Sequence, residues 1–190
     1  MDETFIKGLY LGQLLAVVGI DGNNGMFLIA YAIVEIENKD TWEWFIQNLI
    51  VDLGIENGHA YAFISDKQKW LGLALADLIP NAEHRHCVRH FYNNFKASYS
   101  SLILKQILWD AARATTKPWW QCHMERLKIE SEEAWKWLYP KSTEHWSRSH
   151  FKQHYKCEIL LNNLCEAFNA SILKARGKLI LGMLEAEDGK

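Results

Sequence analysis

Two long apolar segments separated by a turn constrain the fold more than any other feature of this sequence. Residues 12–20 read GQLLAVVGI, residues 26–36 read MFLIAYAIVEI, and the letters DGNNG stand between them. Aliphatic and aromatic runs of this length favour strands, and a dense group of Gly, Asn and Asp favours a tight turn. The sequence therefore predicts an antiparallel hairpin whose first strand is buried on both faces.

Helical and β patterns then alternate along the chain, which predicts a mixed α/β fold. The first helix is expected to begin at Asp40 or Thr41, with Glu43 in the capping-box position, and to end at Gly54. The later elements are a β run at 60–66, a helix at 67–80, a short strand within 82–90 that leads into a helix, a Trp-rich helical segment from about 99 to 156, and a final helix at 157–177.

Composition indicates a packed globular domain without a global field that attracts nucleic acid. The chain has 190 residues, of which 49% are hydrophobic, and its formal net charge is −2. A DNA partner would therefore have to bind a local basic patch. We find neither an apolar run long enough for a membrane span nor the pattern of a secretory signal. Four cysteines are too few for a disulfide scaffold, and we expect reduced thiols in the cytosol or nucleus.

Asp66 is the first candidate for chemistry because it follows a predicted buried strand and precedes a helix. Ligands of α/β proteins bind at that edge of the sheet, where an acid can point into a crevice. The alternative is structural, because Asp66 or the preceding Ser65 can cap the next helix.

Glu166 is the second candidate, on the final predicted helix. Asn162, Asn163, Glu166 and Asn169 share one side at helical spacing, and a solvated helix face is the plain alternative. Two or three converging carboxylates suit Mg²⁺, which prefers oxygen ligands, and Asp2 is available as a third acid.

A His- and Cys-rich stretch and scattered basic residues leave further alternatives open. Cys87 and His90 have a spacing seen in zinc sites, and His154 with Cys157 repeats it in mirror order; a buried cysteine with ordinary histidines is the alternative. Basic side chains near the acids can contact a phosphate backbone or simply be solvated. They are Lys67, Lys69, Arg85, Arg89, Lys174, Arg176 and Lys178.

Four stretches, in this order, resemble plant Mutator-like (MULE) transposases: GQLLAVVGIDGNNGMFLIAYAIVEIENKDTWEWF, FISDKQKWL, PNAEHRHCVRHFYNNFK and NNLCEAFNASILKARGKLI. The similarity covers about residues 2–185. It implies an α/β, ribonuclease H-like mixed sheet core, at 1–95 and 157–185, with an all-helical insertion at about 96–156.

The resemblance also implies a catalytic triad of two Asp and one Glu, a DDE triad. The second Asp of the family stands in a Ser-Asp-x-Gln-Lys stretch, which matches Asp66, and the Glu stands in an Asn-x-x-x-Glu-x-x-Asn stretch, which matches Glu166. The first Asp of the family precedes a Phe/His-Leu/Ile-Lys-Gly stretch, here residues 5–8, and matches Asp2, and a Cys-x-x-His element matches Cys87 and His90.

In such transposases the three acids hold two Mg²⁺ or Mn²⁺ ions for DNA strand cleavage and transfer, so the resemblance implies DNA as partner, a nuclear location and a homo-oligomer. The first core strand should precede Asp2, where only Met1 stands. We therefore expect that strand to be truncated, residues 12–20 to lack their inner partner, and activity to be impaired. The alternatives are a non-catalytic relic or domesticated DNA- or protein-binding module, and a structural zinc domain.

Overall fold

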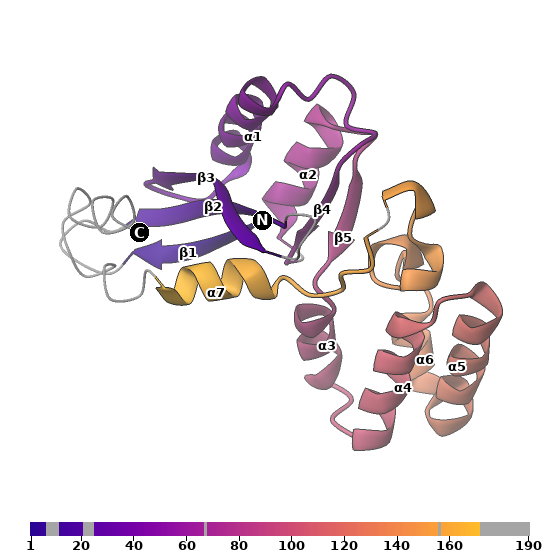
Figure 1. The fold of residues 1–190 in the computed structure, drawn as a ribbon. Helices are drawn as coiled ribbons and strands as arrows, with labels where there is room; N and C mark the ends of the chain where they lie inside the picture. Colours follow the sequence, from indigo (N-terminus) through magenta and orange to yellow (C-terminus); the bar gives the residue numbers. More distant parts are fainter. Residues whose placement is uncertain (7–11, 21–24, 67, 156, 172–190) are drawn as a thin grey trace. The chain divides into compact units, whose positions relative to one another are not determined.

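The computed structural model describes residues 1–6, 12–20, 25–66, 68–155 and 157–171, and the chain divides into two compact units. The first unit comprises Met1–Gly58, Gln68–Pro80 and Asn162–Lys190, and the second comprises His59–Lys67 and Asn81–Leu161. Figure 1 shows the elements of both units in the colours of the sequence. Each unit is described below by itself.

An antiparallel sheet with the order β1-β2-β3 forms the centre of the first unit. Its strands are β1 (Asp2–Ile6), β2 (Gly12–Ile20) and β3 (Met26–Val34), and its helices are α1 (Lys39–Leu53), α2 (Lys69–Leu78) and α7 (Asn163–Ser171). The β2–β3 hairpin confirms the prediction from the apolar segments, although the predicted turn at 21–24 lies outside the described residues. Burial of residues 13–17 also agrees with a strand covered on both faces.

A β-bulge determines which side chains of the hairpin lie on the same face of the sheet. Val17 pairs with Ala30 and Val18 with Leu28, so Ile29 is an extra residue on β3. The extra residue lets Leu28 share a face with Tyr31, because each bulge shifts the alternation by one position. One face packs against Phe168 of α7 through a small cluster whose other members are Leu14, Ala16, Val18, Leu28, Tyr31 and Ile33.

The first strand differs from the expectation of a truncated, missing strand. β1 begins at Asp2 and pairs with β2 from Asp2 opposite Ala16 to Ile6 opposite Gly12. Residues 13–16 therefore have a paired neighbour on each edge, and the expectation that β2 lacks its inner partner is wrong for this part of the strand. The physical reason is that Thr4, Phe5 and Ile6 have high strand propensity, so the residues after Asp2 continue the sheet.

The boundaries of α1 depend on two caps, one of which the sequence pattern placed wrongly. Asn38, not Asp40 or Thr41, is the N-cap: its side chain accepts a hydrogen bond from the Thr41 N–H, and the Thr41 hydroxyl accepts one from the Asn38 N–H. Thr41 thus takes the role predicted for Glu43 in a capping box. Gly54 ends the helix at a φ of 61°, as predicted, because glycine adopts this left-handed conformation without steric strain.

The last described helix begins later than the sequence predicts. Residues 157–161 were expected to open a helix, but α7 begins at Asn163. The backbone before it makes a tertiary hydrogen bond instead, because the Leu160 carbonyl accepts from the Val88 N–H at 2.8 Å. The predicted end of this helix at Gly177 lies outside the described residues.

The second unit combines a parallel strand pair with helices. β4 (Ala62–Ser65) and β5 (Glu83–His86) are parallel, and both lie within predicted β stretches. The helices that follow are α3 (Val88–Lys96), α4 (Leu102–Arg113), α5 (Lys117–Glu130) and α6 (Glu132–Leu138), and then three short 3₁₀ turns, η1 (Thr143–His145), η2 (Arg148–His150) and η3 (Gln153–Tyr155). The regular elements within 102–155 are thus all helical, as the Trp-rich pattern predicts.

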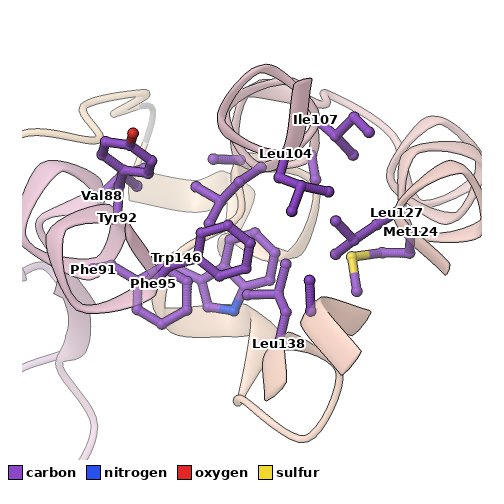
Figure 2. Packing of buried hydrophobic residues seen from close by; sticks show 14 of the residues in the cluster. Val88, Phe91, Tyr92, Phe95, Leu104, Ile107, Met124, Leu127, Leu138 and Trp146 are labelled. Atoms are coloured by element: carbon purple, nitrogen blue, oxygen red, sulfur yellow. The ribbon is translucent and has the colours of Figure 1, made fainter. Parts of the chain in front are cut away.

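An aromatic cluster holds these helices together. Figure 2 shows Trp146, at the end of η1, among Phe91 and Phe95 of α3 and Leu138 of α6. The Trp146 and Phe91 rings are stacked with centroids 5.3 Å apart, and Trp146 is 1% exposed. Burial of so large a ring at the meeting point of several helices contributes more than any aliphatic side chain of the cluster.

The described residues therefore form a mixed α/β structure with one antiparallel and one parallel sheet. A ribonuclease H-like arrangement, with all five strands in one mixed sheet, stays a prediction. Within the ranges that the structure describes, no helix is long and apolar enough to cross a membrane. None of the four cysteines, all of which lie in these ranges, forms a disulfide.

Candidate active site

The parallel ladder brings Asp66 and Cys87 to the same edge of the second unit. Ser65, the last residue of β4, is paired with His86, the last residue of β5. Asp66 and Cys87 come directly after these two residues, so they stand side by side at the carboxyl ends of neighbouring parallel strands. This is the edge at which α/β proteins bind ligands.

His90 completes a group of three potential ligands. The His90 Nδ1 atom lies 2.6 Å from the Asp66 Oδ1 atom, and one ligand atom from each of Asp66, Cys87 and His90 lies within 4.8 Å of the others. Cys87 is the N-cap of α3 and His90 is in its first turn, which places both at one helix end. The Cys87 side chain is buried, whereas Asp66 and His90 are 23% and 33% exposed.

The backbone around this group is fixed by hydrogen bonds from both strands. The Cys87 N–H donates to the Ser65 carbonyl at 2.8 Å, which extends the ladder by one step. The Ser65 hydroxyl, fully buried, donates to the Asp66 carbonyl at 2.7 Å. The N-cap of α2 is Gln68, so neither Ser65 nor Asp66 occupies the capping position that the sequence left open for them.

Three histidines lie behind Ser65. The ring centroids are 5.2 Å apart for His84 and His86, 4.9 Å apart for His86 and His145, and 6.1 Å apart for His84 and His145. The pKa of His84 is lowered to about 3, first because the ring is buried and then because charges on His86 and His145 would repel its own. His84 is therefore neutral. Because the Ser65 hydroxyl already donates its proton to the Asp66 carbonyl, the Nε2–H of His84 is the donor in the 2.8 Å hydrogen bond to the Ser65 oxygen.

A buried ion pair anchors β5. The Arg85 Nε atom is 3.0 Å from the Glu83 Oε1 atom, and the Arg85 Nη1 group donates to the Cys157 carbonyl at 2.7 Å. The guanidinium also lies over the Phe151 ring at 4.0 Å. Arg85 is 1% exposed, so the sequence-based suggestion that it contacts a phosphate backbone is wrong; it stabilises the strand that precedes Cys87.

In the first unit, Asp2 is held by α7. Asp2 pairs with Ala16, which belongs to the face packed against Phe168, so the Asp2 side chain points toward α7. The Asn169 Nδ2 group donates to the Asp2 Oδ2 atom at 2.8 Å, and the Asn162 Nδ2 group donates to the Met1 carbonyl at 3.0 Å. Asp2 is 7% exposed, so its carboxylate is buried against this helix.

Glu166 lies at the margin of the same helix face. At about 100° per residue, Glu166 stands next to Asn162 and Asn169 around the α7 axis. Asn162 and Asn169 are buried, Glu166 is half-buried and Asn163 is exposed. The solvated polar face that the sequence allowed is therefore wrong for Asn162 and Asn169, and Glu166 belongs to the side of α7 that holds Asp2.

The remaining candidates are dispersed. Within the described ranges, His154 and Cys157 do not join the group at Cys87: the His154 ring contacts the His59 carbonyl at 3.1 Å, and the four-ligand zinc arrangement is not formed. Lys69 and Arg89 are exposed. Other basic candidates lie outside the described residues, namely Lys67, Lys174, Arg176 and Lys178.

Residues 1–94 match the model of the MULE transposase domain. The match contains Asp2, Asp66, Cys87 and His90, and it ends before Glu166. It supports a transposon-derived origin for this part of the chain. No curated protein matches the sequence.

The donor atoms differ between the two units. Asp2 and Glu166 offer only carboxylate oxygens, which suits Mg²⁺ or Mn²⁺. Asp66 offers a carboxylate beside a thiol and an imidazole, which are donors that Mg²⁺ does not prefer. The carboxylates of the first unit are thus ligands for a hard ion, while the group around Asp66 in the second unit adds softer ligands.

Proposed function

We propose that the chain carries the catalytic domain of a MULE-type DDE transposase, with Asp2, Asp66 and Glu166 as the acids that bind Mg²⁺ or Mn²⁺. The observation that carries the proposal is the combination of the family match with the position of Asp66 at the carboxyl end of a parallel strand. The substrate is DNA, and the reaction is phosphodiester cleavage and strand transfer. A ribonuclease H-like fold, a plant origin, a nuclear location and a homo-oligomeric form belong to the same proposal.

In such a reaction the chain's own residues would hold the carboxylates in position and bind the DNA backbone. Bound divalent ions would supply Lewis-acid stabilisation of phosphoryl oxygens and an activated water or 3′-hydroxyl. Asn169 keeps the Asp2 carboxylate oriented, and the Ser65 hydroxyl keeps the backbone of Asp66 in place. Exposed Lys69 and Arg89 are available to neutralise phosphates.

Nicking of supercoiled plasmid DNA in Mg²⁺ or Mn²⁺ tests the proposal. We expect Asp66→Asn and Glu166→Gln to reduce nicking at least about 100-fold, because each removes a carboxylate that would hold the divalent ions on which the phosphoryl transition state depends. Asp52→Asn is the matched control, since Asp52 is an exposed acid on α1. Full activity of Asp66→Asn would refute the assignment. A DNA mobility shift without nicking by the unchanged protein would favour the non-catalytic binding module.

A further inference from the structure

Three side chains of unlike chemistry meet where β4 and β5 end, although 20 residues of chain separate Asp66 from Cys87. We propose that Asp66, Cys87 and His90 bind one divalent ion of the zinc type. The site shares Asp66 with the proposed active site, but it requires neither DNA nor the other two acids. It also differs from the zinc arrangement predicted with His154 and Cys157, which the structure does not form.

The donor set selects the class of ion. A cysteine thiolate, a histidine nitrogen and a carboxylate are the three ligand types that zinc accepts, whereas Mg²⁺ is bound by oxygen. Three protein ligands leave one tetrahedral position for water or a phosphate oxygen, as in catalytic zinc sites. Binding releases the Cys87 thiol proton to solvent, because the thiolate is the ligand.

The distances suit a small ion. Metal–ligand lengths of about 2.0–2.3 Å place tetrahedral ligand atoms about 3.3–3.8 Å apart. The ligand atoms of Asp66, Cys87 and His90 lie within 4.8 Å of one another, and the shortest described separation, between Asp66 and His90, is 2.6 Å. The required spacing lies between these two values, so the direct contact between Asp66 and His90 would have to open for an ion to enter.

The site is both held in place and accessible. The Cys87 backbone is fixed by its hydrogen bond to the Ser65 carbonyl, and its side chain is buried. Asp66 and His90 are partly exposed, which provides a path for the ion from solvent.

Titration with Co²⁺ tests the site without any DNA, because Co²⁺ bound to a thiolate gives a sulfur-to-metal charge-transfer absorption. The unchanged chain should show this absorption with one Co²⁺ per chain, and Zn²⁺ should displace the Co²⁺ whereas equal Mg²⁺ should not. Cys87→Ser should abolish the absorption, and His90→Ala should weaken Co²⁺ binding at least tenfold. Cys122→Ser and His123→Ala are matched controls, since Cys122 is exposed and both lie on α5, and they should bind Co²⁺ unchanged.

Because Cys87 is buried, its substitution can disturb the fold and abolish the absorption for that reason alone. Asp66→Asn is therefore a second variant, at a partly exposed ligand. This variant should keep the thiolate absorption but bind Co²⁺ at least tenfold more weakly. Absence of the absorption in the unchanged chain, its persistence in Cys87→Ser, or its loss in Cys122→Ser would overturn the proposal. Loss of nicking in the DNA assay would leave it intact, so the two proposals fail separately.

Discussion

Substitution of Asn169 by alanine tests most directly how Asp2 is held. The Asn169 Nδ2 group donates to the Asp2 carboxylate at 2.8 Å, and both residues are 7% exposed. A hydrogen bond to a charged group contributes about 1.5–3 kcal/mol, and its loss here leaves a carboxylate oxygen buried, so we expect the upper half of that range. Alanine has a higher helix propensity than asparagine, so weaker helix formation does not explain the loss.

The free energy of unfolding, measured by urea denaturation, should therefore fall by about 2–3 kcal/mol, a substantial part of the ~5–15 kcal/mol of an ordinary domain. With a typical denaturant slope the midpoint moves down by about 1 M urea. Asn163→Ala is the matched control, because Asn163 is an exposed residue of the same helix, and it should change stability by less than about 0.5 kcal/mol.

A double-mutant cycle with Asp2→Ala separates the hydrogen bond from general damage to α7. Because the two side chains interact directly, we expect a coupling energy of about 1.5–3 kcal/mol. Effects of Asp2→Ala and Asn169→Ala that add within about 0.5 kcal/mol would show that the contact does not stabilise Asp2, and the reasoning would be refuted.

Three further outcomes follow from other parts of the fold. The pKa of His84 is lowered to about 3 in the folded chain, against an ordinary value of 6.5. Between these pH values the unfolded chain binds a proton that the folded chain does not, so the free energy of unfolding should fall as the pH drops below 6.5. At pH 5 the loss should reach about 2 kcal/mol. Urea denaturation at pH 7 and pH 5 should show a smaller loss for His84→Gln than for His123→Gln, a control at a half-buried histidine of α5, and equal losses would contradict this. Trp146→Ala should cost about 3–5 kcal/mol in the same measurement, whereas Trp119→Ala, at a ring that is 64% exposed, should cost far less. Gly54→Ala should lower the thermal midpoint, because alanine in the left-handed conformation costs about 1 kcal/mol. A Cβ at this position meets no atom within 4 Å, so no steric clash adds to that cost. An unchanged midpoint would argue against the left-handed cap.

Features encoded by neighbouring residues could be predicted from the sequence. The hairpin and the end of α1 at Gly54 follow from local propensity, and both are confirmed. The start of α1 was missed by two residues because Asn38, Asp40 and Thr41 can all cap a helix. The pattern contains several suitable residues, and only the backbone conformation decides among them.

The candidate site depends on contacts that a linear pattern does not contain. Cys87 and His90 were grouped by spacing with His154 and Cys157, whereas the β4–β5 register places them beside Asp66. Strand register is set by pairing across the intervening chain, so it could not be inferred from either stretch alone. The position of Asp66 after a buried strand, together with Cys87 after the next strand, was the available signal for their meeting.

The two amide hydrogen bonds from α7 to the N-terminal strand have a consequence for how the protein is made. They join residues 161 and 167 positions apart, so Met1 and Asp2 leave the ribosome long before Asn162 and Asn169 exist. Contacts of such sequence separation form late, since the whole intervening chain must close as a loop. Asp2 should therefore acquire its final position only after residues 162–169 have left the ribosome, well after the strands of the sheet have been synthesised.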